Sequence, residues 1–293
     1  MYEVTACPIC GGVRLSHHLD TRDYHVTQET FALRRCEDCG LILTTPRPDN
    51  NRLMEYYSSA DYISHTSTGT NLVNQAYLLA RKYTLRQKLN LVEKFAAKDK
   101  LLDFGCGTGE FLKHAQAQQW DTYGVEPAEK ARRAAQAELH HIYPDITSIP
   151  SEALQAITLW HVLEHVPQLN ETLAQLKERL GEAGTIFIAV PNVNSYDSHY
   201  YAQHWAGLDV PRHLWHFSQP NMTRLLQNHQ FKLVQTLPMK LDAYYVSLLS
   251  EKYRLDNKLS IPAAFKAVRS GFRSNLAART SSEYSSLIYV ARK

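Results

Sequence analysis

Four of the five cysteines form two pairs that could bind one metal ion. Cys7 and Cys10 make one C-x-x-C pair and Cys36 and Cys39 the other; each pair is followed by a glycine, and 25 residues lie between the pairs. Two-residue spacing lets both thiolates of a tight turn face one tetrahedral ion, and the glycine permits the left-handed turn that follows. The alternative is two disulfides, which a chain without a secretory leader is not expected to form. The pattern predicts a structural zinc site whose four thiolates leave no open position for catalysis.

A second set of residues forms a glycine-rich turn between an apolar strand and a helix. The turn has three glycines at alternate positions: Gly105, Gly107 and Gly109. A dinucleotide-binding loop would have its third glycine one residue later, where this chain has Glu110. A carboxylate at the start of the helix would repel a pyrophosphate. Together with Asp103, it favours a ligand that carries an ammonium group.

A further carboxylate ends the next strand. Glu126 lies 23 residues after Asp103, where a carboxylate can accept hydrogen bonds from both hydroxyls of a ribose. The D-x-G-x-G-x-G turn followed by this glutamate resembles the S-adenosylmethionine site of class I methyltransferases. The resemblance implies cofactor contacts from Asp103, Gly105, Cys106, Gly107, Gly109, Glu126 and Pro127. It also implies that Asp145 and Ile146 lie against the adenine and that His161 lies near the methionine end of the cofactor.

The elements that must position these residues alternate between strands and helices. Apolar runs predict strands over residues 101–104, 122–126, 140–143, 156–160, 185–190 and 231–237, with a final antiparallel strand over 286–291. Helical spacing predicts helices over 111–115, 131–138 and 169–180. We therefore predict an α/β fold: a seven-stranded, doubly wound, Rossmann-like methyltransferase sheet with a small N-terminal zinc-ribbon module.

The same patterns divide the chain into three parts. We predict a zinc-ribbon module over residues 1–48, a helical linker or lid over 49–98, and a class I methyltransferase domain over 99–293. Helical spacing over 72–95 indicates that the middle part links the module to the sheet and partly covers the cofactor. Residues 238–284 are predicted to be an insertion between the last two strands.

Several segments resemble one bacterial group more closely. These are the two cysteine knuckles, LTTPRP at 43–48, LWHVLEHV at 159–166 and DVPRHLWHFS at 209–218. Together they are similar to the methyltransferase-23-like enzymes that carry an N-terminal zinc ribbon. The resemblance covers nearly the whole chain, and it implies an activity in cell-envelope sugar or secondary-metabolite chemistry.

The methyl acceptor is expected beyond the carboxyl ends of the strands. A general base is needed there for an oxygen or carbon acceptor, and we predict His165 or His213, with Glu164 orienting an imidazole or taking the proton itself. Residues predicted to bind the acceptor are Tyr62, His65, Asn192, Trp205 and Arg212. Two alternatives stay open: Glu164 and His165 could brace the sheet, and Trp205 could pack under the loop.

Composition sets broad limits on the function. The chain has 293 residues and a net charge of +3, too mild a balance to indicate nucleic-acid binding by itself. The mean hydropathy is −0.37, and no apolar run is long enough for a membrane span, so a cytoplasmic protein is expected. Residues 251–293 hold nine basic residues against three acidic ones. We interpret this basic segment as a solvated helical face; the alternative is that it contacts an anionic substrate or phosphate groups.

Three functions follow in order of preference. The first is S-adenosylmethionine-dependent methyl transfer, by in-line displacement, to the O, C or N of a small-molecule, glycan-precursor or lipid acceptor. The second is an RNA methyltransferase that holds RNA with the zinc ribbon and the basic segment, although N-P-P-[YF] and Pro-Cys motifs are absent after the fourth strand. The third is a non-catalytic S-adenosylmethionine-binding or regulatory protein. The sequence does not indicate an oligomeric state.

Overall fold

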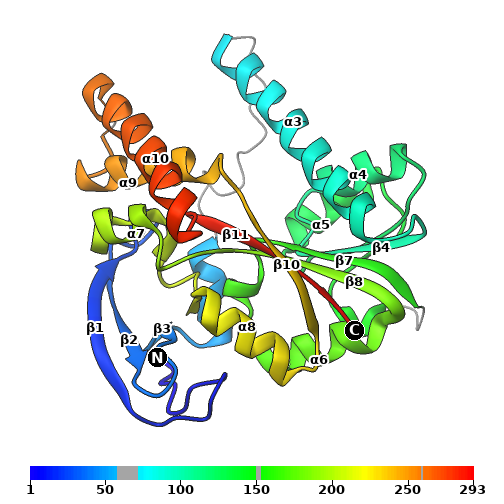
Figure 1. The fold of residues 1–293 in the computed structure, drawn as a ribbon, viewed down its shortest axis with the longest axis horizontal. Helices are drawn as coiled ribbons and strands as arrows, with labels where there is room; N and C mark the ends of the chain where they lie inside the picture. The colour runs from blue at the N-terminus through cyan, green and yellow to red at the C-terminus, as the bar shows by residue number, and fades with distance from the viewer. Residues whose placement is uncertain (58–71, 150–152, 259) are drawn as a thin grey trace.

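The fold is built on two β-sheets. A computed structural model describes residues 1–57, 72–149, 153–258 and 260–293. The larger sheet has seven strands (Figure 1): β4 Lys100–Phe104, β5 Asp121–Val125, β6 Ile142–Tyr143, β7 Leu154–Trp160, β8 Leu180–Pro191, β10 Lys232–Pro238 and β11 Ser286–Arg292.

The strand order of this sheet is β10-β11-β8-β7-β4-β5-β6. Strands β4, β5, β6, β7 and β8 pair in parallel, whereas β11 pairs antiparallel with both β8 and β10. The order reverses at β4, where β5 follows on one side and β7 on the other, and such a switch point is where open α/β sheets bind their ligands. The predicted seven-stranded, doubly wound sheet is confirmed, including its antiparallel last strand.

Helices cover both faces of the sheet (Figure 1). Helices α3 Leu72–Phe95, α4 Glu110–Ala117 and α5 Glu129–Gln136 lie on one face, and α6 Leu169–Arg179 and α8 Gln219–Asn228 lie on the other. The buried strand residues alternate between the two layers. Leu101 packs in the cluster of α3 and α4, and Leu102 packs in the cluster of α6 and α8. A strand buried on both faces explains the near-continuous apolar runs in the sequence.

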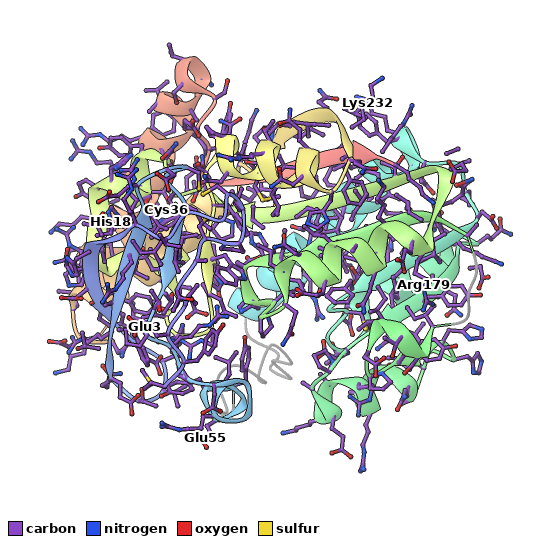
Figure 2. The ribbon with its side chains drawn as sticks, turned by 90° about the horizontal axis from the view of Figure 1, so that it is seen from below. Glu3, His18, Cys36, Glu55, Arg179 and Lys232 are labelled. Atoms are coloured by element: carbon purple, nitrogen blue, oxygen red, sulfur yellow. The ribbon has the colours of Figure 1, made fainter. Side chains whose placement is uncertain are left out.

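The N-terminal part forms a second, four-stranded sheet. It contains β1 Leu15–Arg22, β2 Thr30–Cys36, β3 Ile42–Thr44 and, from far along the chain, β9 Trp215–His216. Strand β9 pairs antiparallel with β3, so the loop that follows β8 completes the N-terminal sheet. In Figure 2, His18 and Cys36 mark this sheet on one side of the molecule, and Arg179 at the end of α6 lies on the other side.

Short helices and a helical pair surround the carboxyl ends of the strands. The short ones are α1 Asn50–Leu53, η1 Met54–Tyr57, η2 Ile146–Ser148, η3 Leu163–His165, α7 Tyr196–Tyr201, η4 Ala202–His204 and η5 Ala206–Leu208. The helical pair consists of α9 Asp242–Arg254 and α10 Ile261–Ser281, which stand between β10 and β11 in the chain. None of the helices in the described ranges combines the length and apolar character that a membrane crossing needs.

Some element boundaries differ from the sequence-based expectation. Strand β8 begins at Leu180, five residues earlier than predicted, so Gly181 and Gly184 lie inside the strand. A Cβ atom on Gly184 would meet the Leu180 side chain at 2.6 Å and the Leu154 carbonyl oxygen at 2.8 Å. Close packing of β8 against β7 therefore explains this glycine. The third parallel strand is also shorter, with only Ile142 and Tyr143 paired to β5.

Candidate functional site

The glycine-rich turn between β4 and α4 is held against the end of β5. The backbone N–H groups of Gly105 and Cys106 both donate to the Val125 carbonyl oxygen, at 2.7 and 3.0 Å. Gly105 has a φ of 79°, and a Cβ atom there would lie 2.5 Å from the Val162 side chain. Gly107 has a φ of 55° and open space where its Cβ would be. The first glycine is thus required by packing, and the second leaves the turn open to a ligand.

Glu126 ends β5 beside this turn. Its carboxylate accepts the Gly107 N–H on one oxygen and the Ala128 N–H on the other, each at 2.8 Å. The side chain is buried, and burial raises its pKa although the two N–H donors oppose the shift. Each carboxylate oxygen has two lone pairs, so both oxygens can still accept a hydrogen bond from a ligand hydroxyl.

Asp103 lies at the end of β4 under the turn. Burial raises its pKa to about 7, and the Thr158 hydroxyl donates to it at 2.7 Å. Lys88 of α3 supplies a nearby positive charge, and its Nζ lies 4.6 Å from the centre of the Trp160 ring. Burial lowers the pKa of Lys88, while Asp103 and Asp242 oppose that shift. The Asp103 carboxylate and the Lys88 ammonium group therefore each stabilise the charged form of the other.

His161 directly follows β7 in a left-handed backbone conformation, with a φ of 58°. Its Nε2 lies 2.9 Å from Asp242 Oδ2, and its Nδ1 lies 3.4 Å from Glu164 Oε1. Burial lowers the pKa of this imidazole, but the two carboxylates outweigh burial and raise it to about 9. His161 is therefore an imidazolium at neutral pH, held between a carboxylate of η3 and one of α9.

Glu164, His165 and His213 come together in one cluster. Their candidate ligand atoms all lie within 4.8 Å of one another. Glu164 is 1% exposed, and neither carboxylate oxygen has a hydrogen-bond partner within the described residues. Burial raises the pKa of this carboxyl, but the imidazoles of His161, His213 and His165 outweigh burial and lower it. The cluster therefore contains a buried carboxylate that faces the His161 imidazolium beside it.

Backbone carbonyls set the orientation of both imidazoles. His213 Nδ1 lies 2.8 Å from the Gly207 carbonyl oxygen, which can only accept, so Nδ1 carries the proton. His165 Nδ1 lies 3.1 Å from the Arg212 carbonyl oxygen and 3.0 Å from the Tyr57 hydroxyl. The rings of His165 and His213 meet edge to face, with centroids 4.5 Å apart. In the tautomers that the carbonyls select, each Nε2 keeps a lone pair.

His165 has a lowered pKa because it is buried. Burial and the neighbouring His213 lower its pKa to about 4, so its imidazole is neutral at pH 7. A base with so low a pKa takes up a proton weakly under neutral conditions. The low pKa of His165 therefore weighs against this residue as the base.

The Arg212 guanidinium is hydrogen-bonded to other residues of the chain. It donates to both oxygens of Asp209, at 3.0 and 2.7 Å, and to Asp23 at 2.9 Å. It also donates to the Tyr56 carbonyl oxygen, and the side chain is 1% exposed. Burial lowers its pKa, but the two carboxylates raise it well above its usual value. This buried pairing ties the turn after β1 to the loop that carries His213.

Two further residues predicted to bind the acceptor are buried in protein contacts. Trp205 donates from Nε1 to Asp197 at 2.8 Å. Asn192 donates from Nδ2 to Glu283 at 2.7 Å and to the Tyr284 carbonyl oxygen at 3.0 Å. Tyr62 and His65, predicted for the same role, lie outside the described residues.

The remaining predicted cofactor residues lie at the ends of β4, β5 and β6. Cys106 is buried, and Pro127 is exposed after β5. Asp145 is exposed and accepts the Ser148 N–H as the N-cap of η2, where the Thr147 hydroxyl lowers its pKa. Ile146 is buried beside it. All lie at the carboxyl edge of the sheet, and their contact with a cofactor stays a prediction.

The four paired cysteines converge in the N-terminal module. The Sγ atoms of Cys7 and Cys39 lie 3.5 Å apart, as do those of Cys10 and Cys36. These separations are too long for disulfides, whose sulfurs lie about 2.05 Å apart. They suit four sulfurs about 2.3 Å from one tetrahedral ion. The cluster therefore fits a zinc ion, with Gly11 and Gly40 in the left-handed region after each pair.

Sequence reasoning missed two charged residues that face the site. Lys88 comes from α3, and Asp242 comes from the start of α9. Neither belongs to a motif: Lys88 reaches the site through the packing of α3 on the sheet, and Asp242 through the packing of α9, which is distant in sequence from β4. A signal was present for Asp242: it is an acidic residue in the first turn of its helix, a short turn after the sixth strand.

A family model described as a methyltransferase domain matches residues 77–236. A curated relative, an uncharacterised methyltransferase of Alkaliphilus oremlandii (strain OhILAs), is 31% identical over 94 residues. That match covers 30% of this chain and 44% of the relative, so the chain spans less than half of the relative's length.

Two solved structures are among those to which this chain is similar. One is phosphoethanolamine N-methyltransferase 2 of Haemonchus contortus in complex with S-adenosyl-L-methionine, with 17% identity and a TM-score of 0.46, covering 71% of this chain and 52% of that one. The other is a SAM-dependent methyltransferase of Archaeoglobus fulgidus, with 17% identity and a TM-score of 0.48, covering 73% of this chain and 94% of that one.

The charge of His161 can be measured directly. We expect its imidazole to titrate near its raised pKa of about 9 in NMR, and Asp242→Asn to move the midpoint down. The folded-state pKa exceeds the unfolded value of about 6.5, so the stabilisation is complete below about pH 6.5 and is lost as pH rises through the folded-state pKa. The stability difference between wild type and His161→Gln, measured by urea unfolding, should therefore shrink from about pH 6 to about pH 10. A midpoint at or below 6.5 would contradict the pairing.

Proposed function

This chain belongs to the family of S-adenosylmethionine-dependent methyltransferase domains of class I fold, and from that premise we propose that it methylates an O, C or N atom of a small-molecule, glycan-precursor or lipid acceptor. One observation carries the proposal. The cluster of Glu164, His165 and His213 lies just beyond β7, and Val162 in the same segment packs against Gly105 of the glycine-rich turn. A base and a cofactor turn are thus adjacent at the switch point of the sheet.

The residues around the turn suit S-adenosylmethionine, which supplies an electrophilic methyl group on its sulfonium. Glu126 keeps lone pairs for the ribose hydroxyls, and Gly107 leaves room beside the backbone. Asp103 has a pKa of about 7, and a neighbouring ammonium group would favour its ionised form. We propose that Asp145 and Ile146 lie against the adenine and that His161 lies near the methionine end of the cofactor.

We assign the role of general base to His213. Its Nδ1 proton is fixed by the Gly207 carbonyl oxygen, so Nε2 has the lone pair that takes a proton from the acceptor. Glu164 stabilises the imidazolium that then forms, because it is a buried carboxylate in the same cluster. His165 stays neutral and orients the cluster, with its Nδ1 held beside the Arg212 carbonyl oxygen.

The roles proposed for the acceptor-binding residues change with these contacts. The Arg212 guanidinium is engaged by Asp23 and Asp209, so we propose that it positions the His213 loop and does not bind an acceptor anion. The contacts of Trp205 and Asn192 likewise favour a packing role for both. Tyr62 and His65 stay predictions for acceptor binding.

We propose that the four paired cysteines hold one structural zinc ion. Burial raises the pKa of the Cys7 thiol and raises that of Cys39 to about 11. A bound cation offsets such a cost, because it stabilises thiolates directly. The thiolate shell is complete, so this ion supports the fold of the N-terminal module and, through β9, the loop that carries His213.

Metal analysis of the purified protein tests the zinc site. We expect one zinc ion per chain, lost in Cys36→Ser together with part of the free energy of unfolding. Cys106→Ser is the matched control, because Cys106 lies outside the cluster and its replacement should leave zinc bound. His213→Gln should also retain the ion; loss of zinc in that variant would place the metal in the histidine cluster.

The acceptor class is tested with labelled S-adenosylmethionine and an extract of the native host. The extract is incubated with the protein and then separated into RNA, protein, lipid and small-molecule fractions. We expect label in the small-molecule or lipid fraction. Label in RNA would overturn the proposal in favour of an RNA methyltransferase. Tight S-adenosylmethionine binding with no label in any fraction would favour a non-catalytic role.

The base is tested with the fraction that accepts label. His213→Ala should lower the rate of transfer by roughly 10²-fold or more, the range for a lost general base, while S-adenosylmethionine affinity in calorimetry stays within about threefold. His199→Gln is the matched control, because His199 is an exposed histidine of the same loop region. An unchanged rate in His213→Ala would transfer the assignment to another group.

A further inference from the structure

Helix α10 exposes a continuous apolar stripe. Five large side chains along it are 49 to 88% exposed: Ile261, Phe265, Val268, Phe272 and Leu276. Their spacing of three or four residues places them on one face of the helix, over a length of about 22 Å. Isolated exposed apolar residues are ordinary on soluble proteins, but a row of this size marks an interaction surface.

The opposite face of α10 is already used. Small residues on that face are buried: Ala263, Ala267, Ser270, Gly271, Ser274 and Ala278. A Cβ atom on Gly271 would lie 2.8 Å from the Tyr244 ring and 2.9 Å from the Tyr244 Cα, so α9 and α10 approach closely there. The stripe is therefore not the face that α10 needs for its own packing, and α10 is firmly joined to α9.

The charges beside the stripe have one sign. Lys266, Arg269 and Arg273 each directly follow a stripe residue and are all exposed, so they form a basic row on one flank of the stripe. Arg279 adds a fourth positive charge, and residues 261–281 contain no acidic residue. Two copies of this face would repel each other, whereas an apolar stripe with a basic flank is complementary to an anionic lipid surface.

The helical pair also lies beside the site. Helix α9 begins at Asp242, whose carboxylate lies 2.9 Å from His161 Nε2. In Figure 1, α9 and α10 lie together at one end of the molecule. A surface bound to α10 would thus lie near the edge of the sheet that carries the candidate site.

We propose that α10 docks the protein on an anionic lipid surface. The apolar stripe enters the boundary between headgroups and acyl chains, and the basic row contacts the anionic headgroups. Resting on the proposed function, this docking selects a lipid or lipid-anchored acceptor among the classes considered above.

Vesicle sedimentation tests the docking without cofactor or acceptor, so its failure is separate from a failure of the proposed methyl transfer. Full-length protein is mixed with vesicles of phosphatidylcholine alone or with added phosphatidylglycerol. We expect binding to the anionic vesicles that is at least tenfold tighter than to the neutral ones and that weakens as salt is raised.

Two double variants separate the apolar and electrostatic parts. Phe265→Ser with Phe272→Ser, and Lys266→Glu with Arg269→Glu, should each weaken binding at least tenfold. The matched controls change equally exposed residues elsewhere: Val13→Ser with Tyr83→Ser, and Lys130→Glu with Arg133→Glu. These controls should bind as wild type does, and circular dichroism should show all four variants folded.

Three outcomes would overturn the docking proposal. They are absence of binding to anionic vesicles, equal loss of binding in the control variants, and a dimer in analytical ultracentrifugation that the two phenylalanine substitutions abolish while vesicles bind nothing. The last result would show that a second copy of the chain covers the stripe.

Discussion

The buried charge of Glu164 constrains the whole candidate site. A carboxylate removed from water costs several kcal/mol unless positive or hydrogen-bonding groups compensate it. Here the compensation comes chiefly from the His161 imidazolium, whose Nδ1 lies 3.4 Å from Glu164 Oε1, while the imidazole of His213, from a loop about fifty residues later, also lowers the pKa of the carboxyl. Because His161 is charged only with the help of Asp242, α9 also takes part in the balance. One carboxylate therefore requires η3, the loop after β8 and the inserted helical pair to meet.

A second buried charge, the Arg212 guanidinium, joins the N-terminal sheet to the loop that carries His213. Arg212 has carboxylates from Asp23, near the end of β1, and from Asp209, in the His213 loop. Removing one partner of such a pair leaves an uncompensated charge in the interior, which typically costs 3–5 kcal/mol. The pairing of β9 with β3 fixes the same loop on the C-terminal side of His213. The N-terminal module thus helps to position His213, which we propose as the general base. A metal ion in the cysteine cluster would therefore affect catalysis through the position of His213, without contacting the reacting atoms.

The cofactor side and the acceptor side of the site are built in different ways. The cofactor turn is local: β4, β5 and the glycines between them create it within about thirty residues, and its backbone donors bind one carbonyl and one carboxylate. The proposed acceptor side draws on the N-terminal module, the loop after β8 and the helical pair after β10. A methyltransferase can therefore keep the first part and change its acceptor by altering the second. The apolar and basic face of α10 belongs to this second part.

The sequence by itself determined the sheet and the cofactor turn, because both depend on local signals. Apolar runs specify strands buried on both faces, and the spacing of Asp103, the three glycines and Glu126 requires only two adjacent strands. The sequence also singled out Glu164, His165 and His213, which the fold brings within reach of one another. Only the tertiary structure decided how these groups are charged. The low pKa of His165, the raised pKa of His161 and the full engagement of Arg212 depend on burial and on partners distant in the chain. Lys88 and Asp242 reach the site for the same reason: the packing of α3 and α9 brings them there, and no local pattern records that contact.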